Sequence, residues 1–146
     1  MFGGGGNSLD EFLIPSAAGD GGLLFYERLP HDRSKEINDF WVRVTDRNLS
    51  AAAHVYAGYA PSHPAPLFAD MARQWAGWSG ELVWKSLEGE FTLRCSRDRM
   101  GHIFIRVDLR SGPMPEDWRV LATVRAEAGQ LESIAKHAIQ FFGCPC

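Results

Sequence analysis

The chain has 146 residues, of which 45% are hydrophobic and 23% charged, as is usual for one globular domain that builds its own core. A formal net charge of −3 argues against the basic footprint that nonspecific nucleic-acid binding requires, so nucleic acid is not an expected partner. No apolar stretch has bilayer-spanning length and residues 1–8 lack a signal-peptide pattern, so we expect a cytoplasmic protein without a membrane partner.

The first part of the chain predicts strands. Four consecutive glycines within residues 1–8 indicate a flexible leader, because phosphate-binding glycine loops follow a strand and this run does not. Short strands are expected at 9–14 and 23–29. Longer strands are expected at 37–45 and 49–59, where side chains alternate between two faces with the period of two that strands require.

Two amphipathic helices are expected, one in the middle of the chain and one near its end. The first carries one apolar stripe, formed by Leu67, Phe68, Met71, Ala72 and Trp75. The second has apolar residues at spacings of three and four over 131–142, and Gly143 ends it. Between them, alternation predicts strands at 81–86, 91–96, 103–110 and 118–125.

Alternating strands joined by tight turns favour antiparallel pairing. We therefore expect an α+β fold with an antiparallel sheet of about six or seven strands and two helices on one face. We expect the domain organisation to be a flexible leader at 1–8, one domain at 9–143 and a tail at 144–146. Trp75, Trp78 and Trp84 are expected in the core, because helix stripes and strand faces account for them.

No residue pattern predicts a catalytic, metal or cofactor site. The five histidines are not at ligand spacing. Ser79 lacks the glycine spacing of a nucleophile elbow, and Glu88 and Glu90 flank a turn glycine, where carboxylates are normally solvated. Cys95 is expected to be a buried free thiol, and Cys144 and Cys146 have no second pair with which to hold zinc.

The outward side of the strands carries the candidate binding surface. The predicted binding residues, which alternate with the core-facing positions, are Arg43, Arg94, Phe104, Arg106, Arg119, Leu121 and Arg125. Trp41 is interleaved with them. Arginine mixed with exposed apolar side chains is typical of protein interfaces. The alternative is that a one-sided antiparallel sheet is simply polar on its solvent side, with Asp108 pairing the arginines.

A tryptophan-rich segment carries a resemblance to a known family. Trp75-x-x-Trp78-x-Gly80, followed by Trp84-x-Ser86-Leu87-Glu88-Gly89-Glu90, resembles an uncharacterised bacterial family of unknown function, over residues 37–142. The order of elements is also similar to small immunity proteins that neutralise contact-dependent bacterial toxins. That layout implies a protein partner and an inhibitory role, and neither resemblance brings catalytic residues with it.

Three functions follow as hypotheses. The first is a non-enzymatic cytoplasmic protein-binding domain, in the manner of an immunity-type inhibitor, that uses the arginine-bearing face. The second is a small-ligand-binding protein or enzyme with a pocket between helix and sheet, lined by Trp78, Trp84 and Glu88. The third is a structural homodimer. The first predicts another protein as the partner.

Overall fold

The fold was obtained as a computed structural model, which describes residues 10–32, 34–35, 37–58 and 62–143. The elements in chain order are β1 (Glu11–Pro15), β2 (Gly22–Leu29), β3 (Asp39–Asp46), β4 (Leu49–Tyr56), α1 (Ala65–Arg73), β5 (Leu82–Lys85), β6 (Phe91–Arg97), β7 (His102–Arg110), β8 (Arg119–Glu127), the 3-10 turn η1 (Ala128–Gln130) and α2 (Leu131–Phe142). The predicted leader and the Cys144–Cys146 tail lie outside the described residues.

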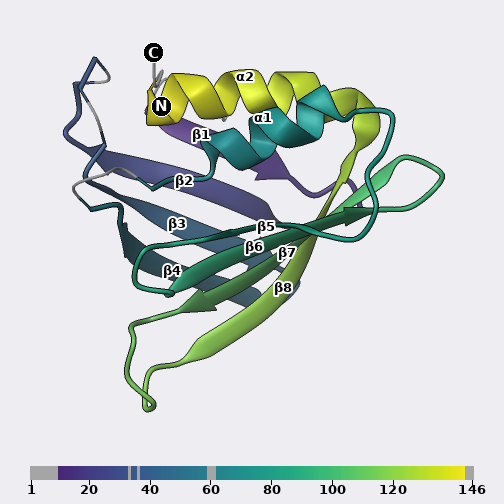
Figure 1. The fold of residues 1–146 in the computed structure, drawn as a ribbon. Helices are drawn as coiled ribbons and strands as arrows, with labels where there is room; N and C mark the ends of the chain where they lie inside the picture. Colours follow the sequence, from purple (N-terminus) through teal and green to yellow (C-terminus); the bar gives the residue numbers. More distant parts are fainter. Residues whose placement is uncertain (1–9, 33, 36, 59–61, 144–146) are drawn as a thin grey trace.

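The strands form two antiparallel sheets of four, ordered β1-β2-β3-β4 and β5-β6-β7-β8 (Figure 1). The prediction of α+β architecture and antiparallel pairing is confirmed. The prediction of one sheet with six or seven strands is wrong. Strand alternation gives every strand an apolar side, and that side can be buried against a second sheet as well as against helices.

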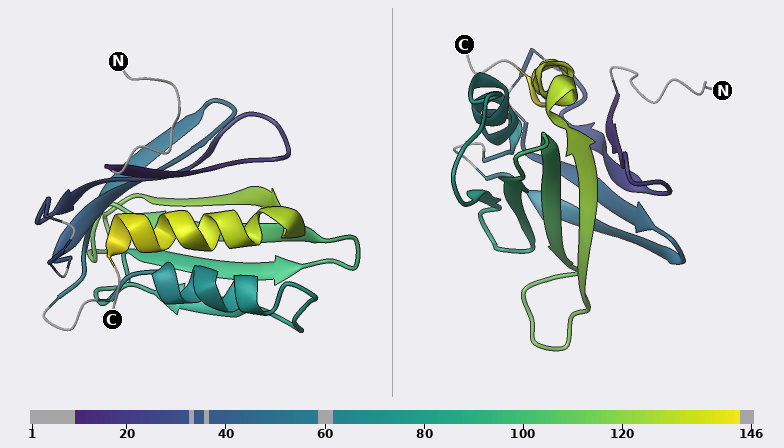
Figure 2. Two further views of the ribbon diagram at one scale, coloured as in Figure 1. Left: turned by 90° about the horizontal axis from the view of Figure 1, so that it is seen from above. Right: turned by 90° about the vertical axis from the view of Figure 1, so that its right-hand side faces the viewer.

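One continuous core joins the two sheets and the helices. Phe25 of the first sheet lies 5.9 Å from Phe91 of the second, measured between ring centroids. Phe142 of α2 packs on Phe40 at 5.1 Å, and Phe68 of α1 packs edge-on against Phe12 at 5.6 Å. The helices lie side by side over one end of the two sheets (Figure 2). These fully buried aromatic rings account for much of the apolar area removed from water.

The two sheets meet directly where β1 runs beside β8. The backbone N–H of Ala17, just after β1, donates to the carbonyl of Arg125 at 2.7 Å. In return the N–H of Arg125 donates to the Ser16 hydroxyl oxygen at 3.2 Å. The turn after β1 therefore occupies the outer edge of β8 at this one residue.

The boundaries of the helices follow the local sequence. Helix α1 starts at Ala65 directly after Pro64, where a missing N–H costs no helical hydrogen bond. It ends at Arg73, so Trp75 falls beyond it and is 68% exposed. The expectation that Trp75 is a core residue is wrong, whereas Trp78 and Trp84 are partly buried against the core. Helix α2 covers the predicted range 131–142.

A bulge in β2 turns one arginine into the interior. The pairing with β3 is irregular between Tyr26 and Leu29, and Glu27 has a φ of 49°. Arg28 is consequently only 3% exposed. Its guanidinium donates to the carbonyls of Pro30, Asp32, Lys35 and, at the end of α2, Phe142, at distances of 2.9 to 3.4 Å.

Candidate binding face

Strand pairing arranges the outward side chains of the β5–β8 sheet in rows across the strands. Taken from the β7–β8 loop towards the helices, the rows are Arg110 with Arg119; Lys85, Thr92, Asp108 and Leu121; Val83, Arg94, Arg106 and Thr123; and Ser96, Phe104 and Arg125. We call this surface the basic face. The sheet that carries it lies in front of the other sheet in Figure 1.

The basic face has an excess of positive charge on a chain that is acidic as a whole. Six of the 15 lysines and arginines of the chain project from it, namely Lys85, Arg94, Arg106, Arg110, Arg119 and Arg125. The carboxylates that alternate outward on the same strands are Asp108 and Glu127. Two like-charged pairs, Arg94 with Arg106 and Arg110 with Arg119, stand directly opposite across strands, an arrangement that is unfavourable without counter-charge.

Three of the arginines of the basic face have carboxylate partners in the described part of the chain; Arg125 is 3.5 Å from Glu127. Arg119 binds Asp108 through two nitrogens, at 3.0 and 2.7 Å, and these bonds hold the pKa of the Asp108 carboxyl below its ordinary value. Arg106 reaches Glu81 at 3.0 Å. Arg94 is exposed and forms no ion pair with any residue in the described part of the chain.

The unpaired charge borders a shallow hollow of about 250 Å³ on the basic face. Its outward lining is formed by Arg94, Arg106, Arg119, Asp108, Leu121 and Thr123. Leu121 is 67% exposed and Val83, in the same row as Arg94, is 50% exposed. The hollow thus combines guanidinium donors with exposed aliphatic surface, and it can accept an anionic side chain beside an apolar one.

The structure brings together six of the seven predicted binding residues and separates the seventh. Arg43 lies on the outer face of the other sheet, as does Trp41. There, Arg43 donates to the Ser50 hydroxyl at 3.0 Å and lies 5.8 Å from the centre of the Tyr26 ring. The grouping of Arg43 and Trp41 with the other residues is therefore wrong, because β3 and β7 belong to different sheets.

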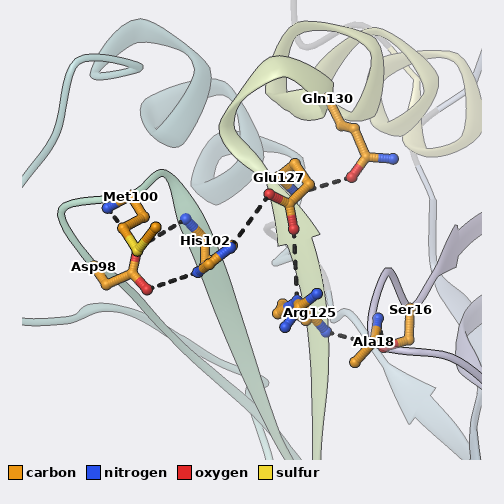
Figure 3. A network of polar contacts seen from close by, with 8 residues as sticks. All are labelled: Ser16, Ala18, Asp98, Met100, His102, Arg125, Glu127 and Gln130. Atoms are coloured by element: carbon orange, nitrogen blue, oxygen red, sulfur yellow. Dashed lines mark hydrogen bonds and ion pairs between the residues drawn. The ribbon is translucent and has the colours of Figure 1, made fainter.

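Sequence reasoning missed a polar network at the end of the basic face that lies nearest to α2 (Figure 3). His102 Nδ1 lies 2.8 Å from Asp98, and its Nε2 lies 3.9 Å from Glu127. Glu127 is also 3.5 Å from Arg125 Nε, and its backbone N–H donates to Gln130. The network connects the β6–β7 turn to the start of α2. A histidine with an aspartate four residues earlier is a weak sequence signal for this network.

The alternative pocket does not form around its three predicted residues. Trp78 donates to the Cys95 carbonyl at 3.2 Å and borders an open hollow that includes neither Trp84 nor Glu88. Trp84 packs against Phe91 at 5.4 Å. Glu88 is exposed in the β5–β6 turn. The residues therefore occupy separate environments.

Glu90 is the buried carboxylate of this region, contrary to the expectation that it is solvated. It is 5% exposed, and the Ser86 hydroxyl, itself 3% exposed, donates to it. Ser86 also accepts the N–H of Phe91 at 3.1 Å. This pair stabilises the β5–β6 turn, because the hydroxyl satisfies a buried acceptor and a backbone donor at once.

Residues suited to metal or thiol chemistry are not gathered at a site. No group of three His, Cys, Asp or Glu side chains in the described residues is placed to hold a metal ion. Burial raises the pKa of the Cys95 thiol to about 12, so the reactive thiolate is suppressed. None of the helices in the described ranges has the length and apolarity needed to cross a membrane.

The fold defines the class of protein: an α+β sandwich in which two antiparallel four-stranded sheets and a pair of helices share one core. Within that class, the chain belongs to a family of unknown function, DUF6228, which matches residues 14–145. This match confirms the resemblance carried by the tryptophan-rich segment. The description of the family does not connect it with immunity proteins. No curated protein and no solved structure matches the chain.

Proposed function

We propose that the protein is a non-enzymatic binding protein whose basic face receives an acidic surface of another protein. The observation that carries this proposal is the incomplete neutralisation of the face. Arg94 stands opposite Arg106, and none of the carboxylates in the described residues forms an ion pair with Arg94. A partner carboxylate at this point would relieve the repulsion between the two guanidinium groups and form charge-assisted hydrogen bonds.

The composition of the face favours a protein over a nucleic acid. Leu121 and Val83 expose aliphatic surface next to the arginines, and arginine beside apolar side chains is characteristic of protein interfaces. A platform for single-stranded nucleic acid needs exposed aromatic rings on which bases stack. Phe104 is the aromatic residue in the rows, and it is partly buried.

Inhibition of a bacterial toxin is a narrower form of this proposal, supported by the order of strands and helices alone. The cytoplasm is the proposed compartment. It is supported by Cys95, a free cysteine among the described residues.

The test begins with the immobilised chain and an extract of its source cells. Proteins that are retained are identified and purified, and their binding to the chain is then reconstituted from the two purified components. We expect a saturable complex with an acidic protein. Reversing both charges with Arg94→Glu and Arg106→Glu should weaken it at least about tenfold, because each substitution replaces attraction by repulsion at the centre of the face.

A matched control is available elsewhere on the surface. Arg73 and Arg99 are exposed arginines outside the rows, so Arg73→Glu with Arg99→Glu makes the same change in net charge. The control should retain binding. Equal loss in both double variants, or a reconstituted partner that is basic or is nucleic acid, would remove the proposal.

A further inference from the structure

One edge of the sheet that carries the basic face is the outer side of β8, and two hydrogen bonds show which backbone groups face this side. Ala128 donates to the Gly101 carbonyl and the Trp118 carbonyl accepts from Ser111, so even-numbered residues at the two ends of β8 bond towards β7. Odd-numbered residues therefore direct their N–H and C=O groups to the opposite side. Arg125 confirms this, since both its groups bond to the turn after β1.

The same parity leaves Arg119, Leu121 and Thr123 with backbone groups that point out of the sheet. Among the described residues, none bonds to the outward N–H or C=O groups of these three. No proline or bulge interrupts β8 there, although such features are what normally block an edge strand. A hollow of about 430 Å³ lies beside the edge at Thr123, bounded by the turn after β1 and by the β3–β4 turn.

We infer that the partner contributes an extended segment that adds to β8 as a further strand of the sheet, antiparallel to it. This inference rests on the proposed function and specifies its mode of recognition. The main-chain groups of Arg119, Leu121 and Thr123 supply the hydrogen bonds. In such a pairing, the side chains opposite these three residues emerge on the basic face.

The chemistry of each row then fixes the chemistry of the segment. Opposite Arg119 the segment carries an acidic residue, because among the described residues Arg110 and Arg119 share one carboxylate, that of Asp108. Opposite Leu121 it carries an apolar residue, which covers a side chain that is 67% exposed. Opposite Thr123 it carries a small polar residue, because the adjoining hollow is lined by charges of both signs. The segment reads polar–x–apolar–x–acidic.

The test uses an acetylated and amidated peptide with the sequence Thr-Thr-Val-Thr-Glu, titrated into the full chain and followed through backbone amide signals. The expected result is a saturable shift centred on Arg119, Leu121 and Thr123, with slower hydrogen exchange at these amides. N-methylation of the valine removes an N–H that faces β8, and should weaken binding at least about tenfold. N-methylation of the threonine that follows it should have little effect, since that N–H faces solvent.

A variant of the chain gives an independent measurement. Thr123→Pro removes an edge-facing N–H that the described fold does not use, so it should abolish peptide binding, while Thr123→Ala should preserve it. Should the proline variant fail to fold, the two N-methylated peptides still decide the matter with the unaltered protein. Equal affinities for those peptides, or no saturable shift at all, would overturn strand addition. The proposed function has its own readout, the effect of the Arg94 and Arg106 substitutions on the reconstituted partner, so the two failures are distinguishable.

Discussion

Arg28 holds the loop after β2 against the end of α2 through hydrogen bonds to four carbonyls. We expect Arg28→Met to lower the free energy of unfolding by about 3 kcal/mol, because it removes charge-assisted bonds and leaves carbonyls without donors. The free energy of unfolding of Arg28→Lys should lie between those of the wild type and Arg28→Met, since a single ammonium group cannot reach carbonyls in several directions. Urea denaturation measures both. A loss below about 0.5 kcal/mol for the methionine variant would contradict this role.

His63 gives the stability of the fold a dependence on pH. Its ring stacks on Phe142 at 4.8 Å, and burial, with a smaller effect of the Arg28 charge, lowers its pKa to about 4. His63 therefore takes up a proton near pH 6.5 in the unfolded chain, but only near pH 4 in the folded chain. Stability contributed by the neutral ring is complete above the unfolded pKa and is lost as the pH falls towards 4.

His63→Phe keeps an aromatic ring on Phe142 and cannot be protonated. Between pH 7 and pH 4.5 the wild type should lose roughly 1 to 2 kcal/mol more than this variant, after allowance for partial exposure of the ring. Denaturation curves of the two proteins at both pH values make the comparison. Parallel losses in the two proteins would show that His63 titrates normally in the folded chain.

Sequence patterns anticipated residues whose environment depends on strand alternation alone. Strand alternation predicts that Arg94, Arg106 and Arg119 point outward, because each follows an inward apolar neighbour, and the strand pairing agrees with this. Arg28 and Glu90 were missed, because their burial depends on a bulge and on a turn bond to Ser86. Such features involve contacts between segments, and no local periodicity reports them.

The β6–β7 turn illustrates how a single carboxylate can organise an element. Asp98 accepts the backbone N–H groups of Met100 and His102 and also contacts the His102 ring. The bond from the His102 backbone, foremost among these, keeps the pKa of the Asp98 carboxyl below its ordinary value. The turn and the start of α2 are therefore joined through side chains that share one histidine.

We expect Asp98→Ala to lower the thermal midpoint more than Asp98→Asn. The amide oxygen of asparagine can still accept the two backbone N–H groups, although it lacks the charge that attracts His102. Calorimetry at neutral pH ranks the three proteins. The difference between wild type and Asp98→Asn should shrink as the pH falls below the usual aspartate pKa, because the unfolded chain takes up a proton there. It should disappear only at lower pH, where the folded carboxyl, whose pKa is lowered, is protonated as well. An identical midpoint for all three proteins would contradict the importance of this turn.

Individual elements were easier to anticipate than their assembly. The long strands and both helices appear close to the expected ranges, since each shows a clear period of two or of 3.6 residues. The division into two sheets was not anticipated. Ala51 and Ala53 of β4 alternate inward like any strand residue, and nothing in that pattern says which other strand lies beside them. For the same reason, alternation could not show that Arg43 lies on a different sheet from the basic face.

At the scale of the whole molecule, one core serves both sheets, so the protein should unfold as a single cooperative unit. Trp41 lies in the first sheet, while Trp78 and Trp84 adjoin the second. We expect urea transitions followed by circular dichroism, by fluorescence of the wild type and by fluorescence of Trp41→Phe to share one midpoint once the variant's own stability is taken into account. Two separate transitions would show that the sheets are independent folding units.

The two hydrogen bonds between the turn after β1 and Arg125 also have a consequence for specificity. They limit how far an added strand can extend along β8, because Ser16 and Ala17 already occupy the edge beyond Thr123. A ligand strand that reaches Thr123 cannot shift by two residues towards Arg125, because it would collide with the turn after β1. Each side chain of the ligand then lies beside one particular row of the basic face. Binding would therefore depend on the amino-acid sequence of the ligand, whereas an edge without a fixed register would accept any extended polypeptide.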